Sequence, residues 1–261
     1  MEWMSLLPAD LGTRLDSLLW SFWLVSLRLG TALMLLPGFG EFQVPARVRL
    51  LLAFGLGVVM MPIVPGMPLP APEHPAMMAQ GCLKELLVGG FFGLGARMLF
   101  SALHVAGQIA GQSMQLANIA AFPGSGFDGG SVIAAFLVLA GLGLVFLTDL
   151  HLVMIQALAQ SYSLIPPAGP VPVAALSRNI ADVVASAFAI GVQLAAPFLV
   201  IAFVFNLGLG LINKAMPQMA VFFVGIPIAV GGGLAVLMLT IGTVLFVLAQ
   251  ALRTWLLTGN L

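Results

Sequence analysis

Six apolar runs dominate the chain, and each is close to or longer than the roughly 20 residues that a helix needs to cross the hydrocarbon core of a bilayer. They cover residues 18–36, 48–64, 83–103, 132–158, 180–205 and 219–252. The 261-residue chain is 61% hydrophobic and only 7% charged, whereas about a quarter of the residues in an ordinary soluble domain are charged. We therefore predict an all-α membrane protein with about six apolar segments.

The last three runs are longer than a straight crossing requires. The final run contains Pro227 and three consecutive glycines, Gly231 to Gly233. Proline and glycine inside a helix favour a kink or a break. The pattern therefore predicts long helical hairpins, some of them bent or broken.

Two proline-rich stretches, residues 65–72 and 165–172, divide the chain. Because proline lacks the backbone N–H that a helix uses, each stretch is predicted to be a stiff connector. The second connector separates an N-terminal part, residues 1–165, from a C-terminal part, residues 173–261, within a single subunit. Acidic residues outnumber basic ones before the first run, unlike the start of a signal peptide, so we expect this segment to be retained.

Charge and residue counts exclude several classes of function. Nine Lys and Arg residues balance nine Asp and Glu residues, so we expect no binding of nucleic acid. The single cysteine, Cys82, cannot form an internal disulfide, and the three histidines show no spacing of a common zinc motif. Neither G-x-S-x-G nor H-E-x-x-H occurs. We therefore expect neither an enzyme nor a cofactor. Lys and Arg residues are evenly divided between alternate loops, which leaves the membrane orientation open.

Charged residues inside apolar runs are costly unless protein groups or water pair with them. The candidates drawn from them are Arg28, Lys84, Glu85, Arg97 and Asp149. Each is a candidate functional residue, and the alternative is pairing between helices or snorkelling of the side chain near a helix end. Arg28 lies in the middle of its run and is the strongest candidate of the five.

The densest polar stretch follows the third run. At helical spacing, Gln108, Gln112 and Gln115 lie at positions i, i+4 and i+7, so they form one amide face. Gly107 and Gly111 form a GxxxG pair on an adjoining face, which favours tight helix packing. The element is therefore predicted to pack closely and to present hydrogen-bonding groups.

A glycine-rich loop, residues 122–130, comes next and carries Phe122, Phe127 and Asp128. It lacks the Lys-Ser/Thr ending of a phosphate-binding loop. Its length and its uncharged lead-in suit a loop that lines or blocks a pore, and the alternative is an ordinary exposed connection.

Several stretches, in this order, resemble the FliR/SctT family, the export-gate component of flagellar and injectisome type III secretion systems. The stretches are Arg28 with Pro37-Gly38, 44–50 (VPARVRL), 84–89 (KELLVG), Ala106-Gly107-Gln108 with Gln112, Ala196-Pro197-Phe198, 207–218 (LGLGLINKAMPQ) and 222–227 (FFVGIP). The similarity extends from about Leu18 to Gln250.

The resemblance implies a subunit that looks like a FliP-like piece joined to a FliQ-like hairpin. It implies assembly with FliP-like and FliQ-like subunits into a channel for unfolded flagellar proteins, with FlhB-like and FlhA-like export components as further partners. The implied location is the bacterial inner membrane, as a multi-pass protein of the flagellar basal body. The flagellar branch is preferred because it is the commoner one, and the injectisome is the alternative.

By position, residues 106–130 correspond to the plug that closes the channel in this family. The plug and gate candidates are Gln108, Gln112, Met114, Gln115, Phe122, Pro123, Gly124, Gly126, Phe127 and Asp128. Many relatives have an Asp-Pro pair ahead of the glycine, whereas this chain has Phe122-Pro123-Gly124. Asp128 is therefore a candidate replacement for the missing acid.

The same resemblance suggests residues for contacts between subunits. These candidates are Arg28, Arg47, Arg49, Lys84, Glu85, Asn213, Lys214, Pro217 and Gln218. One alternative function is a secondary transporter for a small solute, since broken helices and buried amides also form substrate sites. No inverted repeat supports that alternative. A further alternative is a structural membrane subunit that nucleates assembly without gating.

Overall fold

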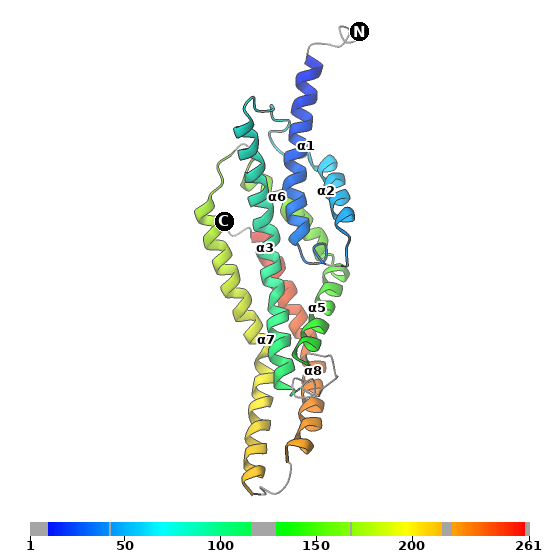
Figure 1. Ribbon diagram of the computed structural model, residues 1–261, viewed down its shortest axis with the longest axis vertical. Helices are drawn as coiled ribbons and strands as arrows, with labels where there is room; N and C mark the ends of the chain where they lie inside the picture. The colour runs from blue at the N-terminus through cyan, green and yellow to red at the C-terminus, as the bar shows by residue number, and fades with distance from the viewer. Residues whose placement is uncertain (1–9, 42, 116–128, 168, 216–220, 259–261) are drawn as a thin grey trace. The chain divides into compact units, whose positions relative to one another are not determined.

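The computed structural model describes residues 10–41, 43–115, 129–167, 169–215 and 221–258, and all the regular structure in these ranges is helical. The all-α prediction is therefore confirmed. The helices, coloured along the chain in Figure 1, are α1 (Asp10–Leu35), α2 (Ala46–Met60), α3 (Pro75–Ser113), α5 (Gly129–Leu147), α6 (Leu150–Leu164), α7 (Val173–Ala215) and α8 (Val221–Thr258).

Four of these helices, α1, α3, α7 and α8, are long and apolar enough to cross a membrane. The pair α5 and α6 adds a fifth crossing if the two helices form one broken span. Helix α2 has only 15 residues, about 22 Å at 1.5 Å per residue, which is less than the roughly 30 Å hydrocarbon core. The prediction of about six segments is therefore not confirmed, and the described residues fit a multi-pass protein with four or five spans.

Of the three overlong runs that were predicted to include bent or broken helices, the structure breaks one and leaves the last continuous. The run 132–158, predicted as one segment, is divided between α5 and α6 at Asp149, whose φ of 55° is left-handed and ends a right-handed helix. By contrast, α8 is continuous through Pro227 and Gly231 to Gly233. In apolar surroundings an unpaired backbone group costs more than the weak helix propensity of glycine, so the helix persists.

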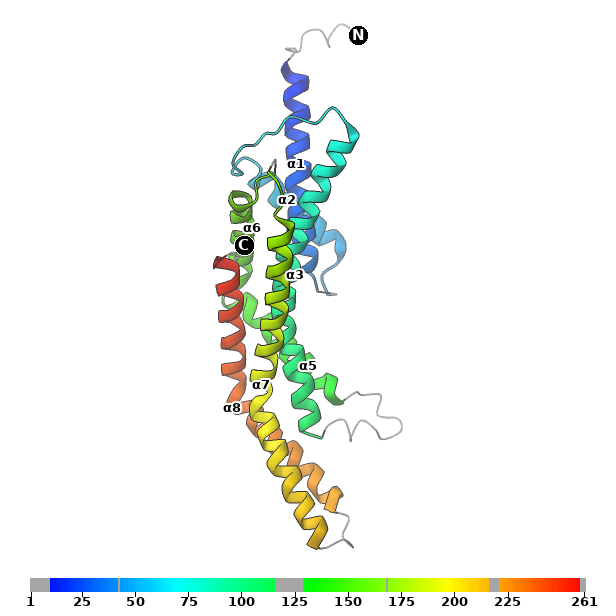
Figure 2. The same cartoon turned by 90° about the vertical axis from the view of Figure 1, so that its left-hand side faces the viewer.

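The chain forms two compact units, and the first comprises Met1–Arg97, His151–Ala181 and Trp255–Leu261. Figures 1 and 2 both show α1 beside the first half of α3 in this unit. The two helices approach closely at Gly89, where a Cβ would overlap the Thr31 hydroxyl and the Arg28 carbonyl. Small residues allow such backbone approach in apolar helix pairs.

The second unit comprises Met98–Leu150 and Asp182–Thr254. Here the second half of α3 contacts α5 at Gly107, where a Cβ would overlap the backbone of Ala134. It contacts α7 where Gly191 faces Val105. The tight packing predicted for the glycine face of α3 is therefore confirmed at Gly107. Both views also show α7 and α8 side by side within this unit (Figures 1 and 2).

Helices α7 and α8 keep most of their apolar surface uncovered. Only 22% of the most apolar window of α7 and 28% of that of α8 is buried within the chain. Large side chains such as Phe203 and Leu239 are exposed. Contact between so large an apolar surface and water is energetically unfavourable, so lipid or partner proteins must cover it.

Candidate functional site

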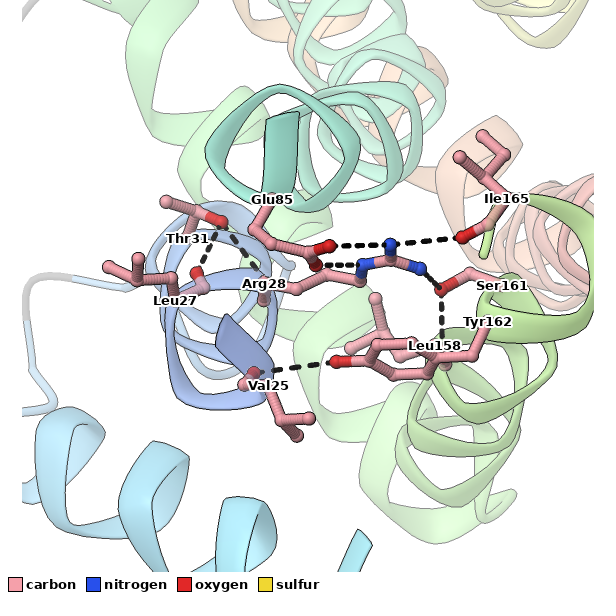
Figure 3. A network of polar contacts seen from close by, with 9 residues as sticks. All are labelled: Val25, Leu27, Arg28, Thr31, Glu85, Leu158, Ser161, Tyr162 and Ile165. Atoms are coloured by element: carbon pink, nitrogen blue, oxygen red, sulfur yellow. Dashed lines mark hydrogen bonds and ion pairs between the residues drawn. The ribbon is translucent and has the colours of Figure 1, made fainter. Parts of the chain in front are cut away.

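The best-defined polar site surrounds Arg28, in the C-terminal half of α1 (Figure 3). The Arg28 and Glu85 side chains are each 1% exposed. Arg28 Nε donates to Glu85 Oε2 at 2.6 Å, and Arg28 Nη2 donates to Glu85 Oε1 at 3.1 Å. The fork of the guanidinium thus matches both oxygens of the carboxylate, which is the strongest geometry for such a pair.

The remaining donors of Arg28 reach α6 and the residue that follows it. Nη1 donates to Ser161 Oγ at 3.1 Å, and Nη2 donates to the Ile165 carbonyl at 3.0 Å. The guanidinium carbon lies 4.0 Å from the centre of the Tyr162 ring, which adds a cation–π contact. Figure 3 shows the Arg28 side chain extending between α3 and α6 to reach these partners.

This network joins three helices and one connector. Tyr162 Oη donates to the Val25 carbonyl on α1 at 3.4 Å. Next to the pair, Lys84 Nζ lies 3.5 Å from the carbonyl of Gly169 in the connector between α6 and α7. The buried charges of Arg28 and Glu85 therefore hold α1, α3 and α6 together within the chain. No group of three His, Cys, Asp or Glu side chains in the described ranges could hold a metal ion.

The candidate subunit contacts have different surroundings. Arg28 and Glu85 form an ion pair with each other within the chain. Arg49 donates hydrogen bonds to the Glu41 and Val44 carbonyls. By contrast, Arg47, Asn213 and Lys214 are exposed, and Lys84 is partly exposed. Pro217 and Gln218 lie outside the described residues.

The second candidate site is the end of α3, where the predicted plug begins. The helix ends at Ser113, and Gln115 has a left-handed φ of 60°. The N–H of Gln115 donates to the Gln112 carbonyl at 3.0 Å, which closes the last turn. Gln108 is partly exposed and Gln112 is exposed. Gln115 lies beyond the helix, so the predicted amide face contains only the first two glutamines.

Met114 is the buried residue of this helix end, with 1% of its surface exposed. It lies against Gly233 of α8, and a small cavity beside it is lined by residues of α7 and α8 that include Phe198 and Val236. The other plug candidates, Phe122, Pro123, Gly124, Gly126, Phe127 and Asp128, lie outside the described residues.

An apolar cavity of about 530 Å³ lies between α1, α2 and α3. Its walls include Trp23, Met34, Phe54 and Leu86, together with the hydroxyl-bearing Ser26. Ser26 Oγ is buried and has no hydrogen-bond partner in the described part of the chain. Sequence reasoning did not find this cavity, nor the roles of Ser161, Tyr162 and Gly233, because none of them belongs to a motif.

The buried ion pair and the end of α3 both lie within one stretch of sequence similarity. Residues 19–255 match the family described as "Bacterial export proteins, family 1". The chain belongs to this family. The resemblance expected from the sequence is therefore confirmed, and it covers the second compact unit and most of the first.

Several proteins with sequences similar to this chain are named as flagellar biosynthetic proteins. The chain is 35% identical to the flagellar biosynthetic protein FliR of Caulobacter vibrioides, over 88% of this chain and 92% of the relative. It is 31% identical to FliR of Aquifex aeolicus over 82% of each chain, and 28% identical to FliR of Bacillus subtilis over 88% and 89%. The family match and the relative with 35% identity together place the chain in the family that includes the flagellar biosynthetic protein FliR.

Proposed function

We propose that this chain is a core component of the type III protein export gate of the bacterial flagellum. With FliP-like and FliQ-like subunits it forms the channel through which unfolded flagellar proteins leave the cell. FlhB-like and FlhA-like components are its neighbours in the basal body at the inner membrane. The observation that carries this proposal is the family match over residues 19–255, together with relatives named for flagellar biosynthesis.

The uncovered surface of α7 and α8 supports an assembly of several chains. At 1.5 Å per residue, the 43 residues of α7 and the 38 residues of α8 extend about 64 Å and 57 Å, well beyond the roughly 30 Å hydrocarbon core, so lipid alone would not cover their apolar surface. In the proposed complex, FliP-like and FliQ-like helices cover part of this surface. The exposed polar residues Arg47 on α2 and Asn213 and Lys214 at the end of α7, together with Pro217 and Gln218, form further contacts with the partner subunits. The chain performs no chemistry, and its role is to shape and close a channel.

In this proposal, residues 106–130 are the plug of the channel. A resting gate must exclude ions and protons, yet it must yield to a moving polypeptide. Hydrophobic side chains close a narrow pore by excluding water, and an uncharged glycine-rich loop can move aside without breaking buried ion pairs. The uncharged sequence from Gln108 to Gly126 and the anchored end of α3 support this assignment.

The assembly is tested by co-expressing the chain with FliP-like and FliQ-like partners from the same genome. The complex is extracted in mild detergent through a tag on this chain, and its mass is measured by native mass spectrometry. We expect one copy of this chain among several partner copies. A solitary monomer or homodimer would contradict the proposal and favour a solute transporter that uses the amides of Gln108 and Gln112.

The plug is tested separately, by deleting residues 123–129 in the assembled complex. We expect the deletion to raise ion leakage in resting cells and to alter secretion. A matched control replaces the same residues with a Gly-Ser segment of equal length, which separates loop length from side-chain identity. An unchanged leak and unchanged secretion after deletion would rule out the plug.

A further inference from the structure

The apolar cavity between α1, α2 and α3 is elongated along α1. Its wall on α1 extends from Trp23 to Leu35, and the lining residues recur every three or four positions, so they share one face of the helix. Twelve residues of helix rise about 18 Å. Ala53 of α2 and Gly90 of α3 are among the residues that line the other walls. Spread over this length, the cavity volume of about 530 Å³ gives a mean cross-section of about 30 Å².

The mouth of the cavity is apolar. Four large side chains of its lining are also exposed on the outside of the chain, namely Trp23, Leu50, Phe54 and Leu86. Helices α1 and α3, which carry two of these residues, are both long and apolar enough to cross a membrane. The cavity is therefore continuous with the surface that these helices present to lipid.

The two hydroxyl groups beside the cavity face neighbouring helices. Thr31 Oγ1 donates to the Leu27 carbonyl at 2.8 Å, and a Cβ on Gly89 would overlap this oxygen. Ser26 Oγ is buried, and a Cβ on Gly57 would lie 2.6 Å from it. Neither glycine lines the cavity. Because both hydroxyls are turned toward these glycines, the cavity favours an occupant that is apolar along its length.

We propose that this cavity binds one acyl chain of a membrane phospholipid. The hydrocarbon core is roughly 30 Å thick, so a chain from one leaflet spans about 15 Å, close to the length of the cavity. A partner helix with a diameter of 10–12 Å has a cross-section of about 80–110 Å², more than twice that of the cavity. A single partner side chain would fill only part of its length. This site goes beyond the proposed export gate, because it requires only that the chain lies in a membrane.

Gly90 offers a way to fill the cavity from within the chain. It lines the cavity, and a Cβ placed on it would meet nothing within 4 Å. Gly90→Leu should therefore occupy the space of the acyl chain without overlapping the protein. Gly55→Leu is the matched control, because Gly55 is exposed on α2, lies outside the lining and also meets nothing within 4 Å. Both substitutions change helix propensity equally.

Photo-crosslinking of the full chain tests the site. The chain is reconstituted into vesicles of phosphatidylethanolamine and phosphatidylglycerol that contain a small share of phosphatidylcholine with a diazirine midway along one acyl chain. Mass spectrometry then maps the labelled residues. Gly30 and Thr31, in the middle of the α1 wall, report on the cavity. Leu19 is exposed on α1 outside the lining, so it reports on contact with bulk lipid.

We expect the wild-type chain to carry label at both places. Gly90→Leu should lower the label at Gly30 and Thr31 several-fold relative to Leu19, and Gly55→Leu should match wild type. Undiminished label in folded Gly90→Leu would overturn the inference. A wild-type chain labelled at Leu19 but not at Gly30 or Thr31 would also overturn it, whether or not Gly90→Leu folds.

The same measurement on the complete export complex separates lipid from protein as the occupant. We expect the label at Gly30 and Thr31 to persist in the complex. Label that is present in the solitary chain but lost in the complex would show that a partner chain fills the cavity, and would overturn the inference. If the chain does not assemble with partners, the proposed export gate fails, while the labelling of the solitary chain still decides whether lipid binds.

Discussion

Ser21 and Arg28 lie two turns apart on α1, and each holds one of the two proline-rich connectors. Ser21 Oγ accepts a hydrogen bond from the Leu69 N–H at 2.8 Å, while Arg28 Nη2 donates to the Ile165 carbonyl at 3.0 Å. Seven residues correspond to about two helical turns, so both groups face the same side of the helix. Helix α1 thus anchors two connectors that are far apart in the sequence.

The buried ion pair should be far more sensitive to loss of one partner than to loss of both. Arg28→Met leaves the Glu85 carboxylate buried without its partner, and Glu85→Met does the same to Arg28. Each single variant should lower the free energy of unfolding by about 3–5 kcal/mol. The double variant should recover much of this loss, because no unpaired charge remains. Thermal unfolding of the purified complex in detergent measures the differences, and a double variant with the summed loss of both singles would contradict this account.

Two adjacent glycines of α3 should respond oppositely to the same substitution. Gly89→Ala places a Cβ against Thr31 and the Arg28 carbonyl, so α1 and α3 must separate. The expected destabilisation is about 1–3 kcal/mol. Gly90→Ala meets nothing within 4 Å and should stabilise the helix by up to about 1 kcal/mol. Thermal midpoints of the two variants distinguish them, and equal shifts would show that the helix crossing does not depend on Gly89.

The two buried serines of α1 form a second matched pair. Ser26→Ala removes a hydroxyl that lacks a partner in the described residues and should raise the free energy of unfolding by about 1 kcal/mol. Ser21→Ala removes the acceptor of the Leu69 N–H and should lower it by about 1–3 kcal/mol. Thermal unfolding gives the sign of each change. A loss of stability in Ser26→Ala would indicate that a ligand or partner uses this hydroxyl in the cavity.

Arg49 and Arg47 should differ in their tolerance of lysine. Arg49 donates through Nε and Nη2 to the Val44 carbonyl, and Nη2 also reaches the Glu41 carbonyl. Lysine lacks this planar fork, so Arg49→Lys should cost about 1–2 kcal/mol. Arg47 is exposed, so Arg47→Lys should change stability by less than about 0.5 kcal/mol. If Arg47→Lys instead weakens recovery of partner subunits in a pull-down, the proposed contact at this residue is supported.

Much of the helical architecture could be predicted from the sequence, because membrane-length apolar runs and proline clusters are local signals. The run ending at Leu36 matches the end of α1 at Leu35, and the two connectors lie outside the described helices. The break at Asp149 was not predictable in the same way. It follows from a left-handed backbone at a residue with no neighbouring proline or glycine.

The candidate site was only partly predictable, because its contacts join residues that are distant in the sequence. The isolated charge of Arg28 indicated that a partner must exist, but the sequence could not choose Glu85 over a group on another chain. Likewise, the glycine triplet of α8 indicated a weak point in a helix. Its third glycine instead receives Met114, a contact that depends on how α3 and α8 pack.

The partners of Arg28 are all made after Arg28 itself. Glu85 follows Arg28 by 57 residues, and Ser161 follows it by 133. At about 5–20 residues per second, Glu85 is added to the chain roughly 3–11 s after Arg28. During that interval α1 carries an unpaired cation that opposes membrane insertion by about 2.5–3.5 kcal/mol. Glu85 of α3 therefore adds stability to the inserted α1, and we expect a nascent chain that stops before Glu85 to hold α1 less firmly in the membrane.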